Sequence, residues 1–242
     1  MEIDAFRQAF FDLTDGWDWE VEGFVDTNGY VYPIDTDTKV ISTVFERLAS
    51  PVIRKICKDH GFVVETANQT TYPDFTMTNS NSKRRVAVDI KTTYKSSTMS
   101  FTLGGYNSFI RNNTKNILYP YNSYDEHWII GFIYKQGDPF QEYDLDAMPK
   151  AGDIGCPYKI DHIFIRKKYE ISGLRAGSGN TKNIGSVKLK NSADFSAVSG
   201  PFLQFSDPHG ACDHFWRNYE NLIGSISNAQ HLYNHPDFEI FK

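Results

Sequence analysis

Hydrophobic residues recur along this chain with two different periods, and each period predicts a different element. Between residues 35 and 60 the apolar side chains return every three or four positions, as on one face of a helix; they are Val40, Ile41, Val44, Phe45, Leu48, Val52, Ile53 and Ile56. Thr36 to Thr38 offer N-caps for this helix, Gly61 ends it, and Pro51 is expected to kink it. A shorter amphipathic helix is predicted over 3–13.

The second period is strict alternation, which predicts strands. Residues 85–92 are the clearest case, because Asp89 and Lys91 project from one face while the aliphatic Val86, Val88 and Ile90 point the other way into a core. Further strands are expected at 62–66, 73–78, 127–135 and 158–171. A helix is expected within 108–118, a loop over 176–186, and a helix that Ser206 caps and that runs through Trp216 and Tyr219. This irregular mixture predicts an α/β domain with a central mixed sheet flanked by helices.

Asp74, Asp89 and Lys91, carried by two of the predicted strands, have the chemistry of metal-assisted phosphodiester cleavage. Two carboxylates can hold Mg²⁺ against a phosphate, and the metal polarises the phosphoryl oxygen and lowers the pKa of a bound water. A lysine beside two carboxylates keeps its proton, so we expect it to orient the water and offset charge rather than act as a neutral base. A solvated Asp-x-Lys strand face is the simpler alternative, and so short a motif leaves both interpretations open.

Composition narrows the class of protein. The chain has 242 residues, 40% of them hydrophobic, and a net charge of −5, which argues against a general nucleic-acid coat protein but not against a site-specific DNA enzyme. The charge also predicts weak DNA affinity without divalent metal and strong salt sensitivity. The longest apolar run has about five residues, the acidic N-terminus lacks the basic region of a signal peptide, and the three cysteines are odd in number. We therefore expect a cytoplasmic protein with reduced thiols and no membrane segment.

Several other features have two interpretations. Glu46 lies off the apolar stripe of its helix, as a surface glutamate or as a third carboxylate facing the metal. The segment Gly177 to Asn183 lacks the third glycine of a dinucleotide loop, and is either a flexible surface loop or a base-reading loop in which Asn180 pairs with adenine and the Thr181 methyl touches thymine. The segment Arg111 to Lys115 suits phosphate contacts but is otherwise a polar helix end. The histidines lack a full zinc ligand set.

Long ordered stretches of the chain are similar to one known family. They are Asp37 to Lys39, Ser42 to Phe45, Tyr72 to Phe75, Asp89 to Tyr94, Phe101 to Tyr106, Ser108 to Ile117, His127 to Gly131, Ala176 to Thr181, Asn183 to Ser186 and Trp216 to Glu220. On these residues the chain resembles the EcoRV-type type II restriction endonucleases, within the PD-(D/E)XK nuclease superfamily. Residues 1–30, 136–170 and 187–205 and the C-terminal end match poorly.

The resemblance implies a restriction-endonuclease-like core in a single endonuclease domain, 1–242. Its catalytic core would span about 36–135, its DNA-recognition loop about 173–186, and a C-terminal DNA-contacting part about 187–242. It also implies a homodimer that cuts both strands of a palindrome in double-stranded DNA, leaving blunt ends and 5′-phosphates. Mg²⁺ would be held by Asp74, Asp89 and the auxiliary Glu46, with Mn²⁺ as a substitute and Lys91 assisting the water. A cognate DNA methyltransferase on the same site would fit.

The resemblance also assigns DNA contacts. The major-groove loop would use Gly177, Ser178, Gly179, Asn180, Thr181 and Asn183, and the minor-groove loop Gln69. Further expected DNA contacts are Thr38, Lys39, Thr92, Thr93, Ser108, Arg111, Asn113, Lys115 and Arg217. Lys182 stands where the family has a threonine, and Asn68 and Thr70 differ from the family. We therefore expect the outer bases of a GATATC-type site to be recognised, whereas the recognition of its central base step stays open. The alternatives are a repair or nicking nuclease of the superfamily and a non-catalytic DNA-binding module.

Overall fold

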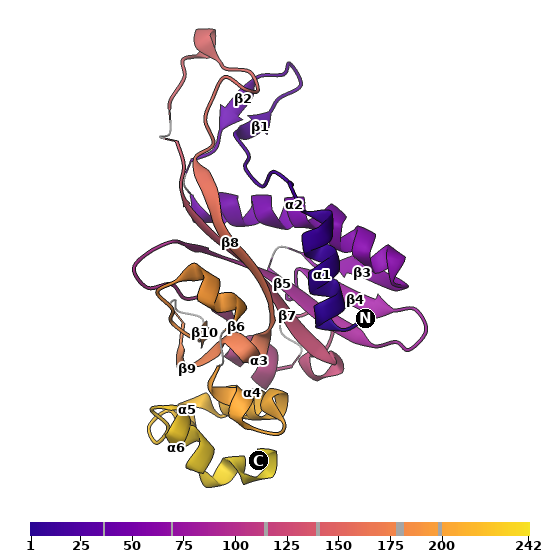
Figure 1. The fold of residues 1–242 in the computed structure, drawn as a ribbon, viewed down its shortest axis with the longest axis vertical. Helices are drawn as coiled ribbons and strands as arrows, with labels where there is room; N and C mark the ends of the chain where they lie inside the picture. Colours follow the sequence, from indigo (N-terminus) through magenta and orange to yellow (C-terminus); the bar gives the residue numbers. More distant parts are fainter. Residues whose placement is uncertain (36, 69, 114–115, 139–140, 178–181, 198–199) are drawn as a thin grey trace.

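A five-stranded mixed sheet forms the centre of the molecule (Figure 1). Its strands, in spatial order, are β3 (Phe62–Thr66), β4 (Phe75–Asn79), β5 (Arg85–Tyr94), β7 (Glu126–Gln136) and β8 (Tyr158–Lys167). Strands β5 and β7 are parallel and the other neighbours are antiparallel, so the mixed α/β sheet expected from the sequence is confirmed. This computed structural model describes residues 1–35, 37–68, 70–113, 116–138, 141–177, 182–197 and 200–242.

Two smaller sheets surround the central one. Strands β1 (Gly23–Val25) and β2 (Val31–Pro33) form a hairpin at the end of the molecule opposite the C-terminal helices (Figure 1). A three-stranded sheet has the order β6 (Thr102–Gly105), β10 (Asn183–Ser186) and β9 (Ser172–Ala176). These strands of three to five residues are too short to show a clear alternation in sequence, and the loop expected over 176–186 is therefore wrong at its C-terminal end, where β10 lies.

The helices are α1 (Ile3–Leu13), α2 (Thr38–Asp59), α3 (Lys168–Ile171), α4 (Pro208–Arg217), α5 (Tyr219–Leu222) and α6 (Ala229–Asn234). A π-helix, η1, spans Tyr106–Arg111, and 3₁₀ turns span Tyr121–Ser123, Leu145–Ala147, Ser192–Ser196, Pro201–Gln204 and Pro236–Phe241. Helix α1 matches its expected bounds, and α2 fills most of the expected range with Pro51 inside it. Among the described residues, no helix is long and apolar enough to cross a membrane.

Three local expectations are corrected. The strand predicted over 158–171 ends at Lys167, because the chain turns there into the single turn of α3. Among the described residues of 108–118, the expected helix is represented by the end of the π-helix η1, which starts earlier, at Tyr106. Helix α4 is capped by Asp207, whose side chain accepts a hydrogen bond from Gly210 N at 2.9 Å, and not by Ser206, whose hydroxyl donates to Phe241 O.

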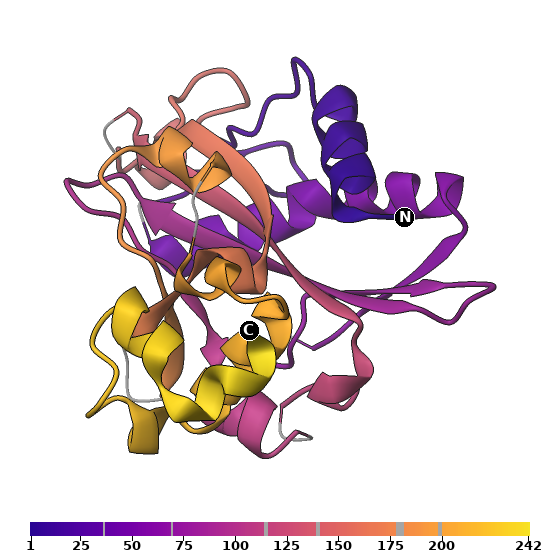
Figure 2. The same cartoon turned by 60° about the horizontal axis from the view of Figure 1, so that its bottom comes forward.

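Two hydrophobic cores lie on opposite faces of the central sheet, one beside α1 and α2 and the other beside the C-terminal helices (Figure 2). Strand β5 serves both: Val86, Val88 and Ile90 enter the first core, and Ala87 enters the second. The predicted alternation of β5 is therefore confirmed. Asp89, on the same face as Ala87, lies between the sheet and the second core.

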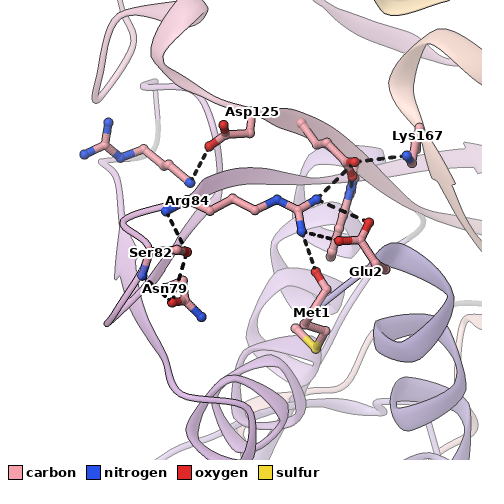
Figure 3. Close-up of polar contacts among 10 residues, drawn as sticks. Met1, Glu2, Asn79, Ser82, Arg84, Asp125 and Lys167 are labelled. Atoms are coloured by element: carbon pink, nitrogen blue, oxygen red, sulfur yellow. Dashed lines mark hydrogen bonds and ion pairs between the residues drawn. The ribbon is translucent and has the colours of Figure 1, made fainter.

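Arg84 fastens the N-terminal helix to the sheet (Figure 3). Its guanidinium donates to Met1 O at 3.1 Å and to Glu2 Oε1 at 2.6 Å, and it pairs with Glu126 Oε1 at 3.1 Å. Lys167 Nζ reaches the same Glu126 oxygen at 3.0 Å. This cluster joins the start of α1 to β7 and β8 beside the first core.

Candidate active site

Asp74 and Asp89 meet where β4 and β5 run side by side. Asp74 directly precedes β4, and its Oδ2 accepts a hydrogen bond from Ile90 N of β5 at 2.6 Å. Asp89 is only 3% exposed, and its carboxylate forms an ion pair with Lys91. Lys91 Nζ also lies 3.3 Å from Ile90 O. The structure thus brings together the three residues that the sequence analysis singled out for cleavage.

The Lys91 ammonium only partly compensates the negative charge of Asp74 and Asp89. Burial raises the pKa of Asp74 well above its usual range, the charge of Asp89 raises it further, and Lys91 only partly opposes them. Burial alone lowers the pKa of Lys91, but attraction by Asp89 and Asp74 outweighs it, so the pKa of Lys91 is raised. Lys91 is therefore a fixed ammonium, which is the protonation state that we expected for it.

A cleft of about 650 Å³ is lined by Asp74 and Lys91, whereas the buried Asp89 is not among its lining residues. The predicted site residues that line it are Thr38, Lys39, Glu46, Asp74, Lys91, Thr92 and Thr93. A second cleft of about 460 Å³ shares Glu46 and Asp74 with it. Burial raises the pKa of Glu46, so this carboxylate is not an ordinary surface glutamate. Helix α2 and strand β5 thus both line this cleft.

The carboxyl groups suit a hard divalent cation. In the part of the chain that the structure describes, no three His, Cys, Asp or Glu side chains are close enough together to hold a metal as a set. Asp74 and Asp89 would therefore be two protein ligands, completed by water or phosphate oxygens. A divalent cation would relieve the repulsion that raises the pKa of Asp74, and so the residues fit Mg²⁺.

The two ends of the segment that the sequence predicts to recognise DNA are joined by backbone hydrogen bonds. Gly177 N donates to Asn183 O at 2.9 Å, and Asn183 starts β10 opposite Gly105 of β6. Tyr106 N donates to Lys182 O at 3.0 Å, which ties one of these ends to η1. Ser178, Gly179, Asn180 and Thr181, and also Gln69 and Lys115, lie outside the described residues, so their expected roles stay predictions.

The other expected DNA contacts lie near this segment and are engaged internally. Arg217 Nη1 donates to Ile110 O at 2.8 Å, and Arg111 Nε donates to Arg217 O at 2.8 Å. Asn113 Nδ2 donates to Asn122 Oδ1 at 3.0 Å. Ser108 lies on η1 close to Gly105. These residues are not among those that line the cleft; they lie around η1 and α4.

Sequence reasoning missed several residues of the two clefts. Ser42, Thr43, Ser100 and Thr102 line the larger cleft, and the basic Arg47 and Arg54 line the smaller one. Arg47 and Arg54 are seven residues apart on α2 and so share a face, a signal that was present in the sequence. Ser100 and Thr102 carried no such signal, because only the tertiary fold brings them to β5.

Comparison with known proteins relates this geometry to a family. The family model described as restriction endonuclease EcoRV matches residues 15–242. The type II restriction enzyme EcoRV of Escherichia coli is 42% identical over 211 residues, which cover 84% of this chain and 83% of that enzyme. Among solved structures, the NlaIV restriction endonuclease matches 95% of this chain and 89% of its own, with a TM-score of 0.44 and 11% identity. From the family match and the 42% identity, the chain belongs to the restriction endonuclease EcoRV family.

Proposed function

We propose that this chain is a Mg²⁺-dependent type II restriction endonuclease, a site-specific deoxyribonuclease that cuts both strands of a palindromic site. The observation that carries the proposal is the arrangement of Asp74 and Lys91 in the wall of the large cleft together with Glu46, with the buried Asp89 carboxylate paired to Lys91. Family membership supports the reaction class.

Each residue has a part in the reaction. Asp74 and Asp89 would hold the metal, which supplies Lewis-acid stabilisation of the scissile phosphate when bound. The Ile90 amide fixes the orientation of Asp74 through its 2.6 Å hydrogen bond. Lys91, kept protonated by its acidic neighbours, orients the attacking water and offsets the charge that develops on the phosphate. Glu46 is the auxiliary acid of the site.

Digestion of plasmid DNA tests the metal requirement. With Mg²⁺ we expect discrete blunt fragments bearing 5′-phosphates, with Mn²⁺ in place of Mg²⁺ we expect cleavage as well, and with EDTA we expect none. Discrete fragments that persist in EDTA would contradict the metal mechanism. Nicks confined to one strand would favour a nicking nuclease instead.

Replacement of a metal-holding acid tests the residue assignment. Asp89→Ala should bind cognate DNA but lose cleavage by several orders of magnitude, because the metal loses one of its two protein ligands. Asp59→Ala is the matched control, since Asp59 lies at the exposed end of α2 and pairs there with Lys55. Cleavage at the wild-type rate by Asp89→Ala would sink the assignment, and gel-shift binding by the intact chain without cleavage in any metal would indicate a DNA-binding module.

The target is proposed to be GATATC-like, read by a homodimer through the loop around Asn180. A good base-edge contact is worth about 1–3 kcal/mol of discrimination, so Asn180→Ala should relax selection at one base pair in each half-site. Sequencing the ends of a digested random-sequence library reports the target, the cut position and the strandedness together. Uniform weakening on all sequences would mean that Asn180 contacts only the backbone. A methyltransferase that modifies the same site is the proposed protector of host DNA.

A further inference from the structure

Lys168 is unusual because it is a lysine that is buried inside the protein. It begins α3, immediately after β8, and is only 4% exposed. Its Nζ has no hydrogen-bond partner among the described residues. It faces two aromatic rings instead, with the Tyr72 centroid 4.9 Å away and the Tyr121 centroid 5.2 Å away. Lysine is almost never buried without a partner, so this position needs an explanation.

Two acids surround this ammonium at longer range. Burial lowers the pKa of Lys168 to about 8, against the attraction of Asp89 on β5 and Asp213 on α4. A cavity of about 10 Å³, which Lys168 lines with His127 and Asp213, has room for about one water. His127 Nε2 beside it also lacks a hydrogen-bond partner among the described residues. One bound water can hydrate both groups, but hydration does not explain why a lysine stands there.

Tyr72, one of the two rings that Lys168 faces, lies close in sequence to the active-site residue Asp74. Tyr72 lies two residues before Asp74, and its hydroxyl is 2.7 Å from His127 Nδ1. Its backbone N donates to Asn116 O at 2.9 Å, and its ring stacks on Phe109 with a centroid distance of 4.7 Å. Tyr72 is thus held by its hydroxyl, its backbone and its ring contact with Phe109, and Lys168 adds a further contact to its ring. A shift of this ring would move the peptide that carries Asp74.

We propose that Lys168 is a positioning residue of the cleavage reaction: its buried ammonium, seated against the Tyr72 ring, fixes Tyr72 and through it the orientation of the Asp74 carboxylate. The inference rests on the proposed function. A merely structural lysine at this place would be replaced by an apolar side chain of similar length with no loss, because removal of a buried unpaired charge is neutral or stabilising. A positioning lysine would lose rate on the same replacement.

The Ile90 amide gives a test that needs neither metal nor DNA, since it donates to Asp74 at 2.6 Å. In Lys168→Met we expect a displaced Ile90 amide NMR signal and faster hydrogen exchange, with recovery in Lys168→Arg. Lys167→Met is the matched control, because this neighbouring ammonium pairs with Glu126 at 3.0 Å. An Ile90 amide identical in Lys168→Met and wild type would overturn the inference.

Single-turnover cleavage gives the second readout. Lys168→Met should cut about ten-fold more slowly, because a small displacement of a reacting group is costly, while its DNA affinity in Ca²⁺ and its folding stay intact. Tyr72→Leu should show the same loss, and the double variant should be no slower than either single one. Additive losses, or a wild-type rate in Lys168→Met, would overturn the inference. If Tyr72→Leu does not fold, the Lys168 variants decide alone.

The two proposals fail in different ways. A wild-type chain that cuts no DNA with Mg²⁺ or Mn²⁺ contradicts the proposed function, whatever the Ile90 amide does. A wild-type chain that cuts, with an unperturbed Ile90 amide in Lys168→Met, contradicts only the positioning role.

Discussion

At the scale of single residues, the site contains buried carboxylates and ammonium groups whose charges are only partly compensated by one another. The Asp74 carboxylate is bound to the Ile90 amide of β5, and the Lys91 ammonium pairs with the neighbouring Asp89. Lys168 is a second cation, attracted by Asp89 but without a hydrogen-bond partner in the part of the chain that the structure describes. Such arrangements oppose folding in the free protein, and they are typical of sites where chemistry rather than stability decides which residue stands there.

The burial of Lys168 predicts a pH-dependent stability. Its folded pKa of about 8 lies below the ordinary 10.5, despite attraction by Asp89, Asp213 and Cys212; burial is the largest cause and Lys91 adds repulsion. Below pH 8 Lys168 is protonated in both the folded and the unfolded protein, and its buried charge lowers the unfolding free energy by about 3 kcal/mol. Between pH 8 and 10.5 the unfolded protein binds more protons than the folded one, so this loss of stability disappears as the pH rises. Lys168→Met should therefore raise Tm most near pH 7 and least near pH 10, as followed by circular dichroism. A Tm difference that grows towards pH 10 would contradict this assignment.

At the scale of elements, periodicity succeeded where an element is long and buried on one side. Helix α1, most of α2, and strands β3, β5 and β7 lie within about two residues of their expected positions, because their apolar stripes are continuous. The alternation of β5 also correctly put Asp89 and Lys91 on one face. Strands β6 and β10 escaped notice because glycines interrupt them and pairing with distant segments, not their own sequence, makes them strands.

The packing of β7 on β8 gives a prediction at this scale. A Cβ at Gly131 would lie 2.1 Å from the Phe164 ring, which is itself fixed against Phe101 and Phe195. Gly131→Ala should therefore cost about 1–3 kcal/mol of unfolding free energy, measured by urea denaturation. Gly224→Ala is the control, because an added Cβ there meets no atom within 4 Å. Equal stability of the two variants would mean that the Phe164 ring can move aside.

At the scale of the whole molecule, the sequence resemblance predicted the family correctly, and the family match over residues 15–242 confirms it. What the sequence left open depends on distant contacts. The cleft is walled by α2, β5 and the start of β6, and only folding brings these segments together. The role of Lys168 was equally hidden, since nothing local marks it as buried.

Assembly is the prediction that belongs to this scale. A palindromic site has two-fold symmetry and calls for two copies of the chain, so we expect sedimentation equilibrium to give twice the 27.7 kDa of one chain. The matching DNA experiment uses a cognate duplex in Ca²⁺, which should carry two chains per site. A single chain bound to the duplex would contradict the homodimer.

The small sheet beside the active site comes from two separate stretches of the chain. Strand β10 pairs with β9 on one side and with β6, which follows β5 before the chain returns to β7, on the other. A chimaera that transplants only 173–186 from another enzyme would therefore pair foreign strands β9 and β10 with a host β6. If 173–186 reads the target, as we propose, redesign of the target preference needs residues 102–105 exchanged together with it.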